Sequence, residues 1–528
     1  MKSEMRAMCA GVALVAALVA GPVDAEEETM PEKILGMYIH QHWAYGHPYA
    51  ARTWTIADWT GYLDGISRLG YNMILIWPVL ETMPDPLTES DRDNLEKIRQ
   101  VIDLAHGRHG MRVYIVLCPN VCARNEEAAQ YTFVERPFFH TDARVDPGDA
   151  AALGRLMAWR EELFRPLGQA DGLFVIDSDP GGYPGSTNIE FVYLLNAHRK
   201  MLDRIRPGME LYYWHAFGWE GYARFYETGD LVIPPIEETQ EAMRLLAKQA
   251  PEPWGLATAK GKEAAEPIGL GDRVLAFNYG AVEGEPSFPM TRFDDGFAYE
   301  GGRNGGARGV LGNSQTHCVQ LPNLFAFARG AQGLPAEEAD YIRFAEDLLP
   351  GHGETIVAGW RALVGDDAEA MDAAKARLAA VAAGTLEPGP LRGLLFGDGR
   401  RFVEDLVHQL DMAATMRRFH AAVHATPRDE ALTAETFRAF VDAAAAWQAR
   451  HDYKNHWYWP PMVEALRALR MPVLDETLDT LTWTADGETG MEKVQNGLSR
   501  LETYTPRLIA AMRTAAEELE AAQAEGGG

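Results

Sequence analysis

YNMILIWP, at residues 71–78, is an apolar run of strand length, and its surroundings decide the fold. Helix-like stretches with amphipathic spacing lie on both sides of it, at 54–70 and 91–110. A buried strand between two such helices is typical of a βα unit in a parallel sheet, because parallel strands are apolar on both faces. The same alternation of apolar run and helix continues from residue 34 to about residue 333.

Eight apolar runs of this kind follow one another. They are ILGMYIH (34–40), YNMILIWP (71–78), RVYIVLCP (112–119), GLFVID (172–177), ELYYWHA (210–216), PWGLATA (253–259), RVLAFNY (273–279) and ARGVLGN (307–313). Eight βα units favour a (β/α)8 barrel over an open doubly wound sheet. The nucleotide-binding alternatives lack their signatures, since no GxGxxG follows the first run and GxxxxGK[ST] does not occur in the sequence.

From Ala336 onward the sequence becomes Ala-rich, apolar at helical spacing and poor in β-branched residues. We therefore expect a barrel over 26–335, an all-helical C-terminal domain over 336–520, and a flexible tail over 521–528. Residues 1–25 combine early basic residues, an apolar run and a Val-Asp-Ala ending. This pattern predicts a signal peptide cleaved after Ala25, and hence an exported protein that is periplasmic or secreted.

The net charge of −27 argues against binding to nucleic acid or anionic membranes, which require basic patches. No later run approaches the roughly 20 apolar residues that span a bilayer, so no stable membrane insertion is expected. Cys118, Cys122 and Cys318 are too few, and odd in number, for a disulfide framework, and we expect them to be small core residues. The sequence suggests neither a cofactor nor a metal centre for the reaction.

Active sites of such barrels are built at the C-terminal ends of the strands, so the residues there are candidates for substrate binding. Most of these candidates carry aromatic, imidazole or amide groups. They are His40, His42, Trp43, Trp77, Glu81, Asn120, Trp214, His215, Trp219, Tyr279, Asn313, Gln315 and His317. This mixture suits a carbohydrate, whose ring has an apolar face and a polar edge. For any single aromatic residue, a place in the core is the alternative.

The fourth apolar run ends on two aspartates in GLFVIDSDPGG (172–182). Asp177 and Asp179 are two residues apart, so in an extended chain both carboxylates lie on the same side and are expected to stand exposed at the barrel mouth. Two carboxylates this close repel, so one is expected to keep its proton at neutral pH. A protonated acid beside an ionised one serves glycosidic bond cleavage. The alternative is that one aspartate caps the Pro-Gly-Gly turn.

With this acid pair after the fourth strand, residues 34–333 resemble the (β/α)8 glycoside hydrolases of the hexosaminidase-like group. That group includes beta-hexosaminidases, O-GlcNAc hydrolases and, more distantly, chitinases and alpha-glucuronidases. The O-GlcNAc hydrolases and alpha-glucuronidases also carry a helical domain after the barrel. The resemblance implies that Asp179 is the general acid and that Asp177 orients a substrate acetamido group, whose carbonyl attacks the anomeric carbon.

Other mechanisms and functions stay open. Asp-x-Asp differs from the adjacent acids of hexosaminidases and the Asp-x-Glu of chitinases, so a two-carboxylate mechanism using Asp179 with Glu283, Glu285 or Glu81 is an alternative. His40 and His42 also resemble the first ligand pair of metal-dependent amidohydrolase barrels, with His215 as a candidate third ligand. A non-catalytic glycan-binding barrel is the other alternative.

The helical domain contains an aromatic stretch, RHDYKNHWYWPP (450–461). This stretch could reach over the barrel mouth and add the aromatic rings of Trp457, Tyr458 and Trp459 to the site. Because aromatic clusters of this kind usually fill contacts between domains, we expect this stretch to pack against the barrel instead.

Overall fold

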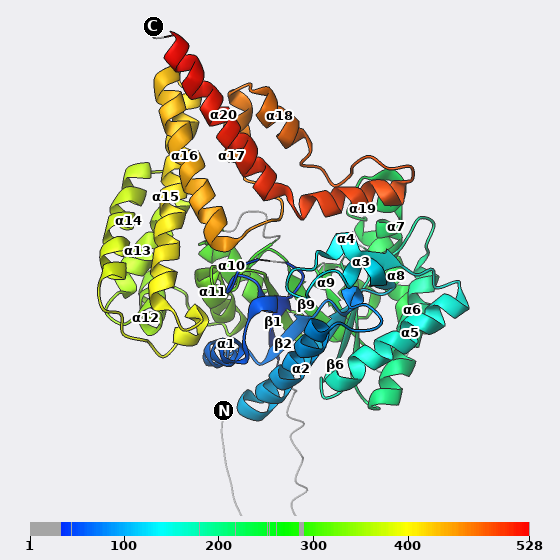
Figure 1. Ribbon diagram of the computed structural model, residues 1–528. Coiled ribbons are helices and arrows are strands. Elements are labelled where there is room, and N and C mark those ends of the chain that lie inside the picture. The colour runs from blue at the N-terminus through cyan, green and yellow to red at the C-terminus, as the bar shows by residue number, and fades with distance from the viewer. Residues whose placement is uncertain are drawn as a thin grey trace, which may run out of the picture. The chain divides into compact units, whose positions relative to one another are not determined.

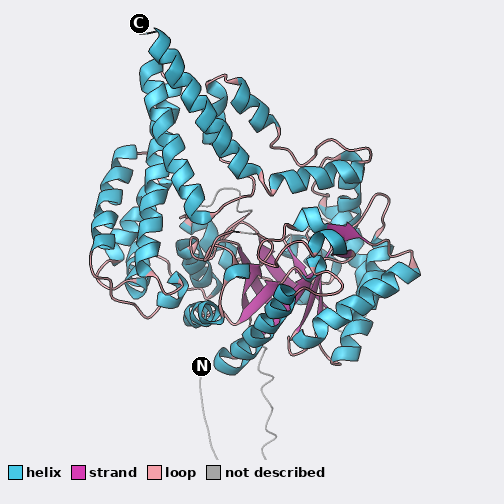
Figure 2. Cartoon of the chain, in the orientation of Figure 1, coloured by secondary structure: helices cyan, strands magenta, loops and turns pink. Residues whose placement is uncertain are grey.

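Eight parallel strands close into a barrel, which confirms the predicted fold (Figure 2). The computed structural model describes residues 33–43, 45–178, 180–216, 218–250, 252, 254–259, 261–284 and 290–526. Around the barrel the order is β1-β10-β9-β8-β7-β6-β3-β2. These strands are β1 (Ile34–His40), β2 (Met73–Trp77), β3 (Arg112–Leu117), β6 (Gly172–Ile176), β7 (Glu210–His215), β8 (Trp254–Thr258), β9 (Val274–Asn278) and β10 (Gly309–Ser314). Each of the eight apolar runs overlaps one of them.

Helices connect the strands. They are α1 (Ile56–Arg68), α2 (Glu89–Leu104), α5 (Ala150–Phe164), α6 (Asn188–Ile205), α7 (Trp219–Thr228), α8 (Ile236–Gln249), α9 (Gly261–Ala265), α10 (Asp295–Arg303) and α11 (Leu321–Ala331). The first two begin at capping boxes, in which a threonine hydroxyl and an aspartate three residues later satisfy each other's backbone N–H groups. Thr55 with Asp58 starts α1, and Thr88 with Asp91 starts α2.

A small antiparallel sheet, which the sequence did not predict, lies in the long connection between β3 and β6. In it β4 (Val121–Ala123) pairs with β5 (Asp142–Arg144). The short helices α3 (Asn125–Ala128) and α4 (Phe138–Thr141) lie between these strands in sequence. Segments of three residues are too short to show the alternation by which a strand is found in a sequence.

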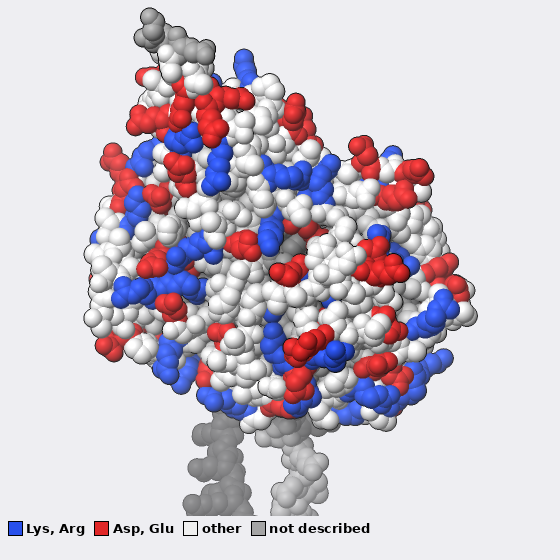
Figure 3. Space-filling view, viewed as in Figure 1, with Lys and Arg blue, Asp and Glu red and all other residues white. Residues whose placement is uncertain are grey.

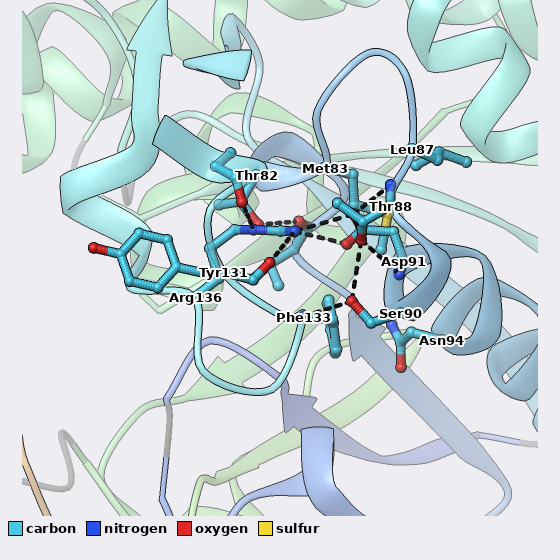
Figure 4. Close-up of polar contacts among 12 residues, drawn as sticks. Thr82, Met83, Leu87, Thr88, Ser90, Asp91, Asn94, Tyr131, Phe133 and Arg136 are labelled. Atoms are coloured by element: carbon cyan, nitrogen blue, oxygen red, sulfur yellow. Dashed lines mark hydrogen bonds and ion pairs between the residues drawn. The ribbon is translucent and has the colours of Figure 1, made fainter. Parts of the chain in front are cut away.

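A buried ion pair holds this connection to α2 (Figure 4). The Arg136 guanidinium donates to both carboxylate oxygens of Asp91, at 2.7 and 3.0 Å, and neither side chain is more than 1% exposed. Arg136 also donates to the backbone carbonyls of Ala128 and Tyr131. One side chain therefore ties the loop after β3 to the capping box at the start of α2.

The chain beyond the barrel is helical, as predicted (Figure 1). Its helices are α12 (Glu338–Leu348), α13 (Gly353–Val364), α14 (Ala368–Ala383), α15 (Gly399–Val423), α16 (Glu430–His451), α17 (Pro460–Ala468), α18 (Pro472–Asp479), α19 (Gly490–Leu501) and α20 (Tyr504–Gly526). The last helix continues beyond residue 520, into the stretch predicted as a tail. Barrel and helices together form one compact unit, residues 33–528.

The surface carries many charged side chains, and the described helices are not of the membrane-spanning kind, as the sequence predicted. Acidic and basic side chains are interspersed over the face shown in Figure 3, and acidic ones gather near the C-terminal end of α20. No helix in the described part of the chain is both long and apolar enough to cross a membrane. Cys118 and Cys318 are buried, as expected for small core residues, whereas Cys122 is only partly buried. The predicted signal peptide, residues 1–25, lies outside the described residues.

Aromatic side chains fill the barrel interior. Phe174 on β6 stacks on Tyr212 of β7 with ring centroids 4.2 Å apart, and Trp214 meets Tyr38 at 4.9 Å and Phe277 at 4.6 Å. Gly255 on β8 makes room for this packing, because a Cβ added there would lie 2.3 Å from the Tyr212 ring. The interior is therefore a packed core, and a ligand is to be sought above it, at the C-terminal ends of the strands.

Candidate functional site

The aromatic core continues up to the C-terminal end of the barrel, which we call the barrel mouth. The His40 ring at the end of β1 lies 4.2 Å from Tyr38 and 5.3 Å from Trp77, the last residue of β2. Just beyond β1, the His42 ring stacks on Trp43 at 4.0 Å with an interplanar angle of 12°. Aromatic and imidazole rings from the ends of β1 and β2 thus lie against one another at the mouth.

Several buried polar atoms at the mouth have no hydrogen-bonding partner among the residues that the structure describes. They are His40 Nδ1, His42 Nε2, Asn120 Oδ1, Ser178 Oγ, Trp214 Nε1, Asn313 Oδ1 and His317 Nε2. Trp219, also predicted for the site, packs instead on Phe191 of α6, on the helix side of the sheet. Such unpaired atoms also occur elsewhere, for example in Trp447, His451 and Asn455 of the helical region, but at this end of the barrel they recur at the ends of β1, β3, β6, β7 and β10. Buried polar groups are normally paired, so a cluster of unpaired ones indicates a site for a hydrogen-bonding ligand or ordered water.

Three histidines of the mouth, His40, His42 and His317, are neutral at pH 7. Burial, reinforced by the nearby His42 and His317, lowers the pKa of His40 well below its usual value. Burial and the charge of Arg52 do the same to His42, and burial lowers the pKa of His317 to about 3. A neutral imidazole has one donor and one acceptor nitrogen, and both kinds of group are needed to bind sugar hydroxyls.

Asp177 is fully buried, which corrects the expectation that it stands exposed at the mouth. One of its oxygens accepts from the Tyr213 hydroxyl at 2.8 Å and the other from the Ala216 amide at 3.0 Å. The Tyr213 ring packs on Phe191 of α6, whereas the next residue, Trp214, faces the barrel interior. Asp177 therefore lies on the helix side of the sheet, where it fixes the chain that follows β6.

Glu81 and Glu283 have a similar arrangement. The carboxylate of Glu81, after β2, accepts from Cys118 N at 2.5 Å, and Cys118 follows β3. The carboxylate of Glu283, after β9, accepts from the amides of Gln315 and Thr316 at 2.6 and 2.7 Å and from the Thr316 hydroxyl. Burial raises the pKa of both carboxyls. Each acid thus ties the end of one strand to the end of the next, a positioning role that does not favour Glu283 as a catalytic residue.

Asp179 and Glu285, the other two carboxylates considered from the sequence, lie outside the described residues. Their catalytic roles therefore stay predictions. The residue between the two aspartates, Ser178, was not singled out in the sequence, although its buried hydroxyl belongs to the cluster at the mouth. Only its position between two candidate acids could have drawn attention to it.

The remaining predicted residues lie around the same end of the barrel. Trp43 donates its indole N–H to the Gln315 side chain, which joins the loops after β1 and β10. His215 Nε2 lies 4.0 Å from an oxygen of Asp177. Tyr279, after β9, is 46% exposed and offers an accessible ring next to Phe277.

The helical region contributes to the mouth through contacts that sequence reasoning did not identify. Tyr453 stacks on Tyr45 at 4.8 Å and His451 on Tyr49 at 3.3 Å, so the stretch after α16 packs on the loop after β1. This agrees with the expected packing of residues 450–461 against the barrel. Trp457 itself is buried, while Tyr458 is half exposed.

Glu502, between α19 and α20, is a buried acid where the helical region contacts the barrel. Its carboxylate accepts from the amides of Phe138 and Phe139 at 2.8 and 3.0 Å and lies 3.6 Å from His42 Nε2. Burial raises its pKa to about 7, and only the two amides and distant charges oppose this. Because burial also keeps His42 neutral, the two groups do not form an ion pair at pH 7.

The raised pKa of Glu502 predicts a pH-dependent stability. The folded protein keeps this proton between pH 4.5 and about 7 while the unfolded chain loses it, so the contribution of Glu502 to stability falls as pH rises through that window. The loss is about 3 kcal/mol. Compared with wild type, Glu502→Gln should therefore become relatively more stable between pH 5 and pH 8, as measured by urea unfolding.

The comparison of variant with wild type cancels the opposite pH dependence of the buried histidines. Glu488→Gln is the matched control, because Glu488 lies in the same region with an exposed side chain. A difference between Glu502→Gln and wild type that does not change with pH would show that the Glu502 carboxyl titrates normally.

Two hollows lie away from the mouth. One, of about 360 Å³, is lined by Lys33, Lys262, Asp272 and neighbouring residues before β1, β9 and β10, at the N-terminal end of the barrel. The other, of about 480 Å³, lies between α14 and α15 around Leu386 and Arg400. Conserved chemistry of (β/α)8 barrels is found at the opposite end, so neither hollow replaces the mouth as the candidate site.

The alternative of a metal centre at His40 and His42 gains no support from the geometry. Within the described ranges, the only three His, Cys, Asp or Glu ligand atoms within 4.8 Å of one another belong to His420, His424 and Glu464, in the helical region. His215, the candidate third ligand, lies 4.0 Å from Asp177 and forms no such group with His40 and His42.

No family model matches the chain, and no curated protein matches it. Among solved structures, the protein CpGH84D is 9% identical, with a TM-score of 0.37 over 91% of this chain and 68% of that one. A GH115 4-O-methyl-alpha-glucuronidase with specificity for decorated arabinogalactans is 10% identical, with a TM-score of 0.40 over 81% of this chain and 59% of that one. The GH20 modules of a pneumococcal exo-beta-D-N-acetylglucosaminidase give 12% identity and a TM-score of 0.34, over 72% and 97%.

The chain is similar to these structures only at low identity and low TM-score, and its family is not identified. An Old Yellow Enzyme from Pichia matches about equally well, with a TM-score of 0.33. At this level of similarity, the neighbours do not indicate an activity.

Proposed function

We propose that this protein is a glycoside hydrolase that binds a glycan at the mouth of its barrel. The observation that supports this most directly is the cluster of unpaired buried polar atoms set among aromatic rings, such as His40 Nδ1, Asn313 Oδ1 and Trp214 Nε1. Sugars offer many hydroxyls to such atoms, and their apolar ring faces pack on aromatic side chains.

In this proposal Asp179 is the general acid that protonates the glycosidic oxygen. Asp177 is a positioning residue: its two oxygens accept from Tyr213 and Ala216, so it fixes the end of β6, from which the chain leads on to Ser178. This differs from the acetamido-orienting role implied by the resemblance, which requires contact with the substrate. Glu285 remains a candidate for the second carboxylate.

The test is a screen of nitrophenyl glycosides and polysaccharides with the purified wild-type protein, in the presence and absence of a chelator. We expect release of nitrophenol or of reducing ends from at least one substrate, unchanged by the chelator. Hydrolysis of amides or esters that the chelator abolishes would favour the amidohydrolase alternative. Tight glycan binding without product release would favour the non-catalytic alternative.

We also propose that the protein is exported. The support is the sequence of residues 1–25, with its basic start, apolar run and Val-Asp-Ala ending. Sequencing of the mature N-terminus from the periplasm or medium should begin at Glu26. A mature N-terminus at residue 1, recovered from the cytoplasm, would contradict this.

A further inference from the structure

His420 of α15, His424 directly after this helix and Glu464 of α17 gather at the surface of the helical region. His420 and His424 are four residues apart, so they lie on the same side of the helix axis, and their ring centroids are 4.4 Å apart. Glu464 of α17 faces them, with Oε2 at 3.8 Å from His420 Nε2 and Oε1 at 3.8 Å from His424 Nε2. All three ligand atoms lie within 4.8 Å of one another.

The hydrogen bonding prepares one of these imidazoles for coordination. His424 Nδ1 donates to the backbone carbonyl of His420 at 2.9 Å. In the neutral ring this places the proton on Nδ1 and leaves the lone pair on Nε2, the nitrogen that faces Glu464. A bond from the second ring nitrogen to a carbonyl is the usual support of metal-binding histidines.

The distances between the imidazole nitrogens and the Glu464 carboxylate fit ligands of one metal ion better than direct hydrogen bonds. At 3.8 Å neither Nε2 is within hydrogen-bonding distance of the carboxylate. Around a zinc ion with bonds of 2.0 to 2.2 Å, tetrahedral ligand atoms lie about 3.4 Å apart. The two N···O distances exceed this by a few tenths of an ångström, and all three ligand atoms lie within 4.8 Å of one another. The nearby cations are engaged elsewhere, Arg417 with Asp366 and Arg418 with Asp372.

We propose that His420, His424 and Glu464 bind a divalent transition-metal ion, with Zn²⁺ as the best match to two imidazoles and one carboxylate. The side chains are 35%, 36% and 67% exposed, so the ion can enter from solvent and keep a water as fourth ligand. The ion would link α17 to α15 and stabilise the helical region. This site is separate from the barrel mouth, and the proposal does not depend on the glycosidase activity.

The experiment uses the full-length mature protein, without a polyhistidine tag and freed of metal by a chelator. We expect titration with ZnCl₂ to show one site by calorimetry, and CoCl₂ to give the visible absorption of tetrahedral Co²⁺. His424→Ala and Glu464→Gln should each weaken Zn²⁺ binding at least tenfold. His408→Ala, on the same helix, is the control and should bind as wild type does.

A second readout separates loss of the site from loss of the fold. Saturating Zn²⁺ should raise the Tm of wild type and of His408→Ala, but not that of His424→Ala, while all metal-free proteins should unfold at similar temperatures. Zn²⁺ binding that is absent in wild type, or unchanged in both His424→Ala and Glu464→Gln, would overturn the proposal.

Discussion

Asp179→Asn is expected to lower kcat for glycoside hydrolysis by about 10² to 10⁴, the usual contribution of a general acid. Asparagine keeps the size and shape of the side chain but cannot donate the carboxylic proton to the leaving oxygen. The Tm should stay close to that of wild type. The measurement is steady-state hydrolysis of the best substrate from the screen, with Asp230→Asn, an exposed aspartate on the loop after α7, as matched control.

The neighbouring aspartate gives a contrasting result. Asp177→Asn replaces a buried carboxylate that accepts from Tyr213 and Ala216, so it should lower the Tm as well as the activity. If Asp179→Asn retained full hydrolysis while Asp177→Asn lost it without loss of stability, the two roles would have to be exchanged.

Arg136→Met is expected to destabilise the protein by about 3 to 5 kcal/mol, the cost of breaking a buried ion pair. The substitution leaves the Asp91 carboxylate buried without its partner and removes the donors to the carbonyls of Ala128 and Tyr131 (Figure 4). Urea unfolding at neutral pH measures the effect. Arg99→Met is the control, because Arg99 pairs with Glu96 and Asp103 on the exposed face of the same α2 and should hardly matter.

A double variant separates the ion pair from the carbonyl bonds. Asp91→Leu with Arg136→Met removes both charges, so it should be less destabilised than the sum of the two single variants. Equal stabilities of Arg136→Met and Arg99→Met would contradict the structural role given to this pair.

The strands could be predicted because the barrel buries them on both faces. β2, for example, is an uninterrupted apolar run, and α2, which follows it, begins at a capping box. β4 and β5 escaped prediction because three residues each, such as Val121–Ala123, show no period. The fold around them depends on the long-range pair between Arg136 and Asp91, which no local pattern indicates.

The location of the candidate site could also be predicted, since its residues follow strand ends. The side of the sheet on which Asp177 lies could not be predicted. Alternation along a strand shows only which side chains share a side, whereas the pairing of β6 with β7 places Asp177 on the same side as Tyr213. The contact of Glu502 with the barrel could not be predicted for another reason. It meets Phe138 across more than 360 residues of sequence, and only the packing of α19 on the barrel brings them together.

The central claim is that the barrel mouth binds a glycan through its unpaired polar atoms. Calorimetry with an oligosaccharide substrate and the Asp179→Asn protein, which should bind without turnover, tests it most directly. We predict one site, whose affinity falls at least tenfold when Asn313→Ala removes one of these atoms and is unchanged by His408→Ala on α15. No glycan binding by the folded protein, or binding that Asn313→Ala leaves intact, would contradict the account.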